Sequence, residues 1–485
     1  MPSLVQLPTE LLIQIAAQFD GPSRQQDLSN FALTSRIVRD IAQDVLFTTP
    51  CVGHPNRDHK REAFMLARTM IEQPCLATKI RHLAVEVLHP ALEGEYSIGS
   101  PSAEQAAGFA ADKHAVLKAC WNFARQSKVD LTNWIEGMEE GLESFYLGAC
   151  LAFATSLESL NIHVNSGSGS EASRVPQNLF YACHIGQTVN TIPAFAGLTS
   201  LTTNCPLPWV LVSLPNLRRL HFRLNEYSAP YDDFPKQPVQ LKLSSLIISI
   251  SEAVLVPYEK LTATANRTFR YFAYLMQHTD KLEHLALRVT REYPFRIYKD
   301  VKRDWSMLIF RIPSLENLKS FEIDAAGIRK GPVQHAVYEE MTERLLRMRA
   351  APVKSLKRFP NLRRLVVPQS VIVDEKQVGD QASWETACLP NTLQSIEIID
   401  STQLLNQWAF HTLNDRRSFS ALTRIVVWCD RKGEPVERVD KLCDFDFVWD
   451  DMRDAGVALE THGPSERLQW RRHWEDSYLG DVEEL

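Results

Sequence analysis

The feature that most constrains the fold of this chain is a short apolar motif that recurs along most of its length. In each copy, two residues separate the first apolar position from the second, and one residue separates the second from the third. The end of each copy alternates with period two, as a half-buried strand does. The motif therefore predicts a series of short strands whose stacked repeats share one core. The second positions, called the middle anchors below, are Leu83, Leu160, Leu201 (in the weakest copy), Leu220, Leu246, Leu285, Phe321, Leu365, Ile396 and Ile425.

The copies are irregularly spaced. Successive middle anchors are separated by as few as 19 residues, from Leu201 to Leu220, and by as many as 77, from Leu83 to Leu160. Several copies follow a Pro-Asn or Pro-Ser pair, and proline just before a strand is compatible with the hydrogen-bond ladder. Helical insertions at 104–150 and 331–350 are expected to fill two longer gaps. We expect burial beneath parallel neighbouring strands for Leu83, Leu160, Leu220, Leu246, Leu285, Leu365 and Ile396.

The first fifty residues have a different pattern, typical of three short amphipathic helices. Residues 7–19 read LPTELLIQIAAQF, in which Pro8 suits a first helical turn. A second helix is expected from Asp27 and a third in RIVRDIAQDVLF, from Arg36. A module of this size buries too little apolar surface to be stable alone. We therefore expect some of its apolar side chains to be exposed and to need a partner.

This module resembles the F-box. The resemblance rests on three blocks in order: Leu7-Pro8-x-Glu10-Leu11-Leu12-x-x-Ile15, then Asp27-Leu28-x-x-Phe31-Ala32-Leu33-Thr34-Ser35-Arg36, then Ile41-Ala42 with Leu46-Phe47. One departure is that many F-boxes carry a tryptophan in the third helix where this chain has Ile37-Val38. A generic three-helix cap is the alternative, and it does not explain the Leu-Pro-x-Glu-Leu-Leu opening. The resemblance implies docking onto the Skp-type adaptor of an SCF cullin-RING ubiquitin ligase, through Leu7, Pro8, Glu10, Leu11, Leu12, Ile15, Leu28, Phe31 and Leu33.

The recurring strand motif resembles the leucine-rich repeat, with Asn165 and Asn225 at the polar position that ends a full repeat. An F-box followed by irregular leucine-rich repeats is a known family architecture, and this chain is similar to many fungal F-box proteins. The implied fold is α/β, with an F-box at 1–50 and a helical linker at 51–75. An irregular solenoid with helical insertions follows at 76–455, with parallel strands on the concave side and helices and loops outside. Residues 456–485 are expected to form a cap or tail.

Composition narrows the class of partner and the compartment. The net charge is −6 and the basic residues are scattered, which argues against nucleic acid as a partner. The longest apolar stretch, 243–256, contains four serines and Glu252 and is shorter than the ~20 residues of a membrane span. No basic side chain precedes Arg24, so a signal peptide is not expected. Nine cysteines without a C-x-x-C pair favour reduced thiols in the cytoplasm or nucleus, and neither disulfides nor structural zinc.

No motif for nucleotide binding, acyl transfer or zinc proteolysis is present, so we expect no catalysis, cofactor or metal. Three clusters have alternative interpretations. Asp444, Asp446, Asp450 and Asp451 suggest a cation site or, preferably, a solvated helix face. Tyr227, Tyr231 and Phe234, in the loop 226–240, are a candidate partner-binding loop or pack back on the array. Trp470 and Trp474, in a predicted helix after Pro464, form a target-binding helix or a terminal cap.

Two functions fit these features. The first is a substrate-recognition subunit of an SCF ubiquitin ligase, which binds the adaptor through the F-box and a target protein through the repeats. The second is a scaffold protein whose F-box acts without a cullin or is vestigial. Co-purification with both adaptor and cullin would favour the first.

Overall fold

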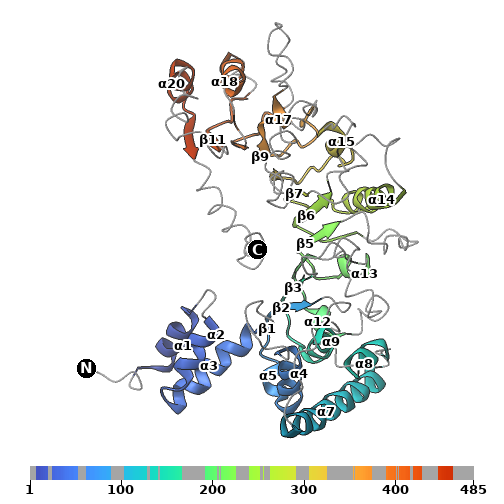
Figure 1. Ribbon diagram of the computed structural model, residues 1–485. Coiled ribbons are helices and arrows are strands. Elements are labelled where there is room, and N and C mark those ends of the chain that lie inside the picture. Colours follow the sequence, from blue (N-terminus) through green and yellow to red (C-terminus); the bar gives the residue numbers. More distant parts are fainter. Residues whose placement is uncertain are drawn as a thin grey trace. The chain divides into compact units, whose positions relative to one another are not determined.

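The structure is a computed structural model, in which the strands form a twelve-stranded parallel sheet in chain order and helices lie between many of them (Figure 1). Two compact units divide the chain, Met1–Phe222 and Arg223–Leu485. The fold is therefore α/β, as the motif predicts. The residues described are 7–19, 24–52, 62–88, 103–127, 132–139, 143–165, 192–204, 207, 209–224, 240–251, 255, 263–290, 305–324, 353, 355–373, 389–399, 401, 404–414, 419–428 and 446–462.

Three helices begin the first unit: α1 (Thr9–Ala17), α2 (Arg24–Ala32) and α3 (Arg36–Thr48). Pro8 directly precedes α1, where a missing backbone N–H costs nothing. Ser35 caps α3, because its hydroxyl oxygen accepts a hydrogen bond from the Val38 N–H at 3.2 Å. The helices share a small core, in which the Phe19 and Phe31 rings lie 5.5 Å apart. Its buried residues are Leu12, Ala16, Leu28, Phe31, Val38, Ile41 and Ala42.

The rest of the first unit alternates helices with parallel strands. The middle anchors Leu83, Leu160, Leu201 and Leu220 lie opposite one another across β2 to β5, and all four are buried. Strand β5 runs two residues past the end of this unit. The elements are β1 (Cys51–Val52), α4 (Glu62–Glu72), α5 (Pro74–Ala77), β2 (His82–Leu88), α7 (Ala103–Ser127), α8 (Thr132–Glu139), α9 (Glu143–Phe153), β3 (Ser159–Asn165), α12 (Pro193–Ala196), β4 (Ser200–Thr203), α13 (Trp209–Val212) and β5 (Arg219–Leu224).

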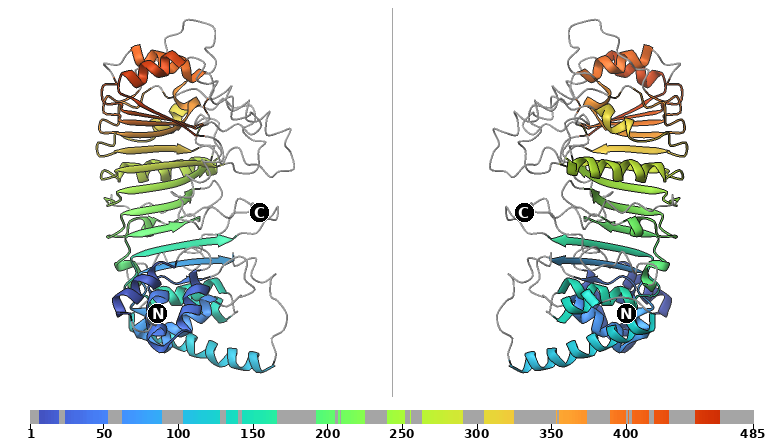
Figure 2. Two further views of the ribbon diagram at one scale, coloured as in Figure 1. Left: turned by 90° about the vertical axis from the view of Figure 1, so that its left-hand side faces the viewer. Right: turned by 90° about the vertical axis from the view of Figure 1, so that its right-hand side faces the viewer.

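The second unit repeats this arrangement, and Figure 2 shows its strands stacked one above another. Its middle anchors form one continuous row across β6 to β11, which Leu459 extends onto β12. The elements are β6 (Ser245–Ser251), α14 (Ala263–Gln277), β7 (His284–Thr290), α15 (Trp305–Phe310), β8 (Ser320–Asp324), β9 (Arg364–Pro368), α17 (Gln369–Ile372), β10 (Ser395–Ile399), α18 (Leu404–Asn414), β11 (Arg424–Trp428), α20 (Asp446–Asp454) and β12 (Ala458–His462).

Each of the ten predicted motif copies is a strand, and the seven middle anchors expected to be buried are at most 2% exposed. Their burial beneath parallel neighbouring strands is confirmed. Three anchors lie in the first compact unit and four in the second, so a single core shared by all seven is not shown. The helical prediction for 104–150 corresponds to α7, α8 and α9, whereas 331–350 lies outside the described residues. Strands β1 and β12 were not predicted. Strand β1 has only two residues, and β12 has Gly456 and Thr461 where the motif requires apolar residues.

The polar residue just before a motif copy ties one turn to the preceding turn. The side-chain amides of Asn216, Asn317 and Asn361 donate to the carbonyl oxygens of Ala196, Asp280 and Glu316, at 2.7, 2.8 and 2.7 Å respectively. In the next copy, the Thr392 hydroxyl donates to the carbonyl of Pro360 at 2.8 Å. These bonds satisfy turn carbonyls that no strand pairs, which explains why asparagine recurs at this position.

Candidate functional site

The three N-terminal helices expose large apolar side chains although their own core is complete. In the described part of the chain eight large apolar side chains are exposed, and four belong to this module. The four are Leu11 (44% exposed), Ile13 (46%), Leu33 (78%) and Ile37 (50%). Four of the eight exposed large apolar side chains thus lie on one three-helix module, which makes it a candidate interaction surface.

Helix geometry explains why these side chains point outward. Leu12 and Ala16 are four residues apart on the buried face of α1, so Leu11 and Ile13 lie on its two flanks. Positions two residues apart on an α-helix are separated by a rotation of about 200° around its axis, so one flat partner surface cannot cover both flanks equally. Leu11 shares its flank with Ile15, which is partly buried against the module's core.

The turn between α2 and α3 fixes Leu33. Its N–H donates to the Asn30 carbonyl at 3.1 Å, and the following Thr34 donates from both N–H and hydroxyl to the Phe31 carbonyl. The chain then enters the Ser35 cap, which leaves Leu33 outside the core as the most exposed of the four residues.

The nine residues predicted to bind the adaptor fall into three groups. Leu12, Leu28 and Phe31 are core residues, which a partner could reach only if the helices separated. Leu7 and Ile15 are partly buried against that core. Pro8, Glu10, Leu11 and Leu33 are exposed. Ile13 and Ile37 were not among the predicted adaptor contacts. Ile13 lies off the apolar stripe predicted for the first helix, whereas Ile37 was assigned to the stripe of the third helix together with Ile41 and Val45.

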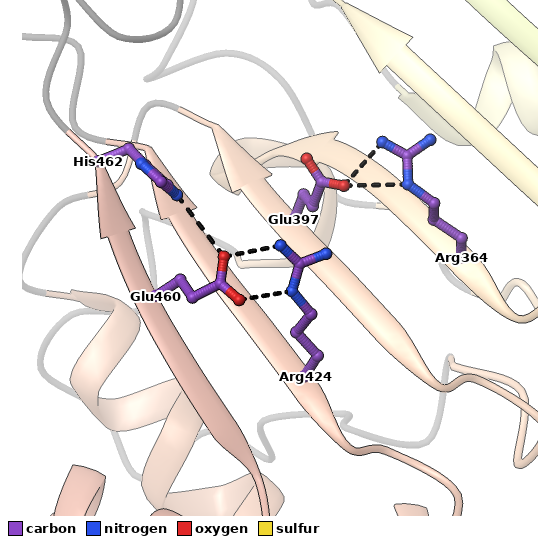
Figure 3. A network of polar contacts seen from close by, with 5 residues as sticks. All are labelled: Arg364, Glu397, Arg424, Glu460 and His462. Atoms are coloured by element: carbon purple, nitrogen blue, oxygen red, sulfur yellow. Dashed lines mark hydrogen bonds and ion pairs between the residues drawn. The ribbon is translucent and has the colours of Figure 1, made fainter. Parts of the chain in front are cut away.

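A second candidate surface lies on the sheet of the second unit, on the face opposite the middle anchors. We call it the polar face; its residues alternate with the anchors along β7 to β12. Arg364 and Arg424 occupy the same register position, since both lie opposite Ser395. Each reaches diagonally to a glutamate on the next strand, Glu397 or Glu460 (Figure 3).

The two ion pairs differ in burial. Arg364 donates from Nε at 2.9 Å and from a terminal nitrogen at 2.7 Å to one oxygen of Glu397, which is only 5% exposed. Arg424 binds both oxygens of Glu460, at 2.8 and 2.6 Å, and both side chains are more than 40% exposed. These hydrogen bonds lower the pKa of Glu460 and raise that of Arg424.

Aromatic and apolar side chains lie beside the Arg424–Glu460 pair. The His462 ring stacks on Trp428 with centroids 4.2 Å apart. The Nε2 of His462 lies 3.7 Å from a carboxylate oxygen of Glu460 (Figure 3). Trp428 also belongs to a buried cluster with Val366, Ile399 and Val426. At this end of the polar face, the charged side chains of Arg424 and Glu460 are therefore exposed, whereas the apolar cluster is buried.

One carboxyl of the polar face has an unusual environment. Glu322 on β8 is buried, and this desolvation raises its pKa to about 7. Arg288 and Arg364 oppose the rise, whereas Asp324 and Glu397 add to it.

The sequence analysis missed the polar face. Its residues occupy the variable positions of the motif, directly before and after each middle anchor. A comparison of those positions between copies could have identified it. Of the predicted acidic cluster, Asp450 and Asp451 are exposed on α20, and Arg453 forms an ion pair with Asp450. The described residues contain no group of three His, Cys, Asp or Glu side chains that could hold a metal ion. Two predicted sets lie outside the described residues, namely Tyr227, Tyr231 and Phe234 in the loop 226–240, and Trp470 and Trp474 near the C-terminus.

Comparison with known proteins adds little to these observations. Within the described residues, no helix combines the length and apolarity that a membrane span requires. No known protein family matches the sequence, and comparison with curated proteins gives no significant match.

Proposed function

We propose that this chain is the substrate-recognition subunit of an SCF-type ubiquitin ligase. Its N-terminal helices act as an F-box that binds a Skp-type adaptor and, through it, a cullin. Its strand-forming motifs act as an irregular leucine-rich-repeat solenoid that binds a target protein. The chain works in the cytoplasm or nucleus without catalysis or a cofactor, by raising the concentration of the target near a ubiquitin-loaded enzyme.

The observation that carries this proposal is the exposure of Leu11 and Leu33 on a module whose core is already filled. Burying a leucine side chain contributes about 1.5–3 kcal/mol, so both residues favour association with an apolar partner surface. Both also belong to the F-box-like motif, in which the opening Leu-Pro and the second helix contact the adaptor. A cap that served only the array would bury these side chains against the array instead.

The polar face supports the second half of the proposal. Its partly exposed Arg364 and exposed Arg424 are of a residue type that is favoured at interaction hot spots. Its paired charges are carried by strands of the sheet, so their positions are fixed relative to a partner that binds there.

Affinity purification tests the proposal. A tagged full-length chain should recover both the adaptor and a cullin, identified by mass spectrometry. Replacing Leu11 and Leu33 together by alanine should reduce recovery of both, because loss of one central hot spot weakens binding by about thirtyfold or more. Ile13→Ala is the matched control: Ile13 is as exposed as Leu11 on the same helix, but on the opposite flank. Equal recovery from the double variant and the wild type would refute the docking surface.

The same experiment distinguishes this function from that of a scaffold protein. The observation favouring a scaffold is the third helix, where Val38 is buried and only Ile37 offers an apolar contact in place of the tryptophan of many F-boxes. A smaller contact weakens adaptor binding. Recovery of the adaptor without a cullin, or of neither, would support a scaffold.

A further inference from the structure

The long helix α7 has an exposed side that the function proposed above does not use. It packs against α4, α8 and α9 of the first unit (Figure 1). Val116, Cys120 and Ala124 are buried, and because they are four residues apart they form one face of the helix. The exposed residues of α7 lie on the other side.

Four of these exposed residues lie close together around the helix axis. We call them the α7 stripe: His114, Lys118, Trp121 and Arg125. Their spacing of four, three and four positions places them within about 60° of one another around the axis. Lys118 and Arg125 are positively charged, and Trp121 between them is 38% exposed. The stripe is therefore a basic surface with an aromatic side chain near its middle.

The two charged residues directly before the stripe already have partners within the unit. Asp112, the one acid among the described side chains of α7 (residues 112–126), forms an ion pair with Arg68 of α4 at 2.5 Å. The Lys113 ammonium donates to the backbone carbonyl of Glu139 at the end of α8. By contrast, the side chains of the stripe form no ion pair, hydrogen bond or ring contact within the described part of the chain. Their charge and aromatic surface are available to a partner.

The composition of the stripe favours a protein segment over a lipid surface or nucleic acid. A helix that lies on a membrane inserts its apolar face among the lipids, whereas the apolar face of α7 is buried in its own unit. Binding to nucleic acid gains its affinity from many phosphate contacts. The stripe offers only Lys118 and Arg125 as permanent cations, on a chain whose net charge is −6.

We propose that the α7 stripe binds an acidic segment of a partner protein, with carboxylates paired to Lys118 and Arg125 and an apolar side chain against Trp121. Tryptophan and arginine are favoured at interaction hot spots. Lys118 and Arg125 are seven positions apart, which corresponds to about 10.5 Å along the helix. An extended segment advances about 3.3 Å per residue, so its two acids are about three positions apart, with the apolar residue between them.

Random peptides displayed on phage and selected on the full-length chain test this site. A first passage over a variant with Lys118→Glu, Trp121→Ala and Arg125→Glu removes peptides that bind elsewhere on the chain. The wild type should then enrich peptides that have two acidic residues about three positions apart and an apolar residue between them.

Fluorescence anisotropy of the enriched peptides measures the contribution of each residue. Trp121→Ala should weaken binding about thirtyfold or more. Lys118→Glu should weaken it about tenfold or more, because it places a negative charge against a carboxylate of the peptide. Arg39→Glu is the matched control, since Arg39 is an exposed cation on α3 of the same unit and its substitution changes the net charge equally. Circular dichroism checks that each variant is folded.

Enrichment of no peptide, enriched peptides without paired acids, or equal binding by Trp121→Ala and wild type would overturn the acidic-segment site. Binding to phosphatidylserine vesicles or to a DNA duplex that Lys118→Glu abolishes would also overturn it, because the stripe would then serve a lipid or nucleic acid. These assays contain neither adaptor nor cullin, and the stripe lies outside the N-terminal helices and the polar face. Loss of this site with normal adaptor and cullin recovery would therefore leave the proposed function standing, and successful selection without adaptor recovery would do the reverse.

Discussion

The two arginine–glutamate pairs of the polar face predict very different losses of stability from the same substitution. Arg364 and Arg424 both begin a strand, share a register position and pair with a glutamate on the next strand. They differ in burial, because Glu397 is 5% exposed and Glu460 is 41% exposed. Arg364→Met leaves a buried carboxylate without its partner, whereas Arg424→Met leaves a carboxylate in contact with water.

The difference in cost follows from desolvation. Breaking a buried pair by removing one partner costs about 3–5 kcal/mol, whereas an exposed pair contributes about 0.2–1 kcal/mol. For a domain of this size, a loss of 1 kcal/mol lowers Tm by roughly 2 °C. Arg364→Met should therefore lower Tm by about 6–10 °C, and Arg424→Met by about 2 °C or less.

Thermal denaturation followed by circular dichroism measures the Tm of both variants. A third variant isolates the cause: removing both charges with Arg364→Met and Glu397→Leu should recover most of the loss, because no unpaired charge remains buried. Equal losses from the two single variants, or no recovery in the double variant, would refute the assignment of Arg364–Glu397 as a buried pair.

Three further predictions follow from individual residues. Leu285→Ala, in the row of buried anchors between Leu246 and Phe321, should destabilise the chain by about 2–5 kcal/mol in urea denaturation, and a loss below 1 kcal/mol would contradict its place in the core. Burial raises the pKa of Glu322 to about 7 from 4.5, so the folded state holds this proton more tightly than the unfolded chain. Its contribution to stability is therefore greatest below pH 4.5 and falls by about 3 kcal/mol as the pH rises through about 7; comparing wild type with Glu322→Gln at about pH 5 and pH 8 should show this fall only in the wild type. Iodoacetamide should alkylate the exposed Cys75 in the native chain but not Cys120, because burial raises the pKa of the Cys120 thiol to about 12. Mass spectrometry after limited labelling would show which of the two cysteines is alkylated first, and earlier alkylation of Cys120 would contradict this prediction.

The sequence predicted the strands well because their signal is local and repeated. Each copy of the motif has its first apolar residue buried as well as its middle anchor, as at Leu282 and Leu285, so the pattern reports the core directly. Strand β12 was not predicted, because it is defined by its pairing with β11 and its own sequence lacks the motif. Gly456 precedes it with a φ of 83°, a conformation that favours glycine and excludes a motif leucine.

The candidate sites were harder to predict, since they depend on contacts between distant residues. Arg364 and Glu397 are 33 positions apart, and no local pattern links them. In the N-terminal helices, the apolar stripe located the module but did not separate core from surface. Leu11 and Leu12 are adjacent and chemically identical, yet only the packing of three helices decides that Leu12 is buried and Leu11 exposed.

Titration calorimetry of the purified full-length chain with a purified Skp-type adaptor tests the central claim most directly. We predict saturable, equimolar binding by the wild type, unchanged binding by Ile13→Ala, and binding weakened by about thirtyfold or more in Leu11→Ala. The two residues are almost equally exposed on the same helix, so a nonspecific apolar attraction would affect both variants alike. No binding by the wild type, or equal weakening by the two substitutions, would contradict an F-box that docks through the Leu11 flank of α1.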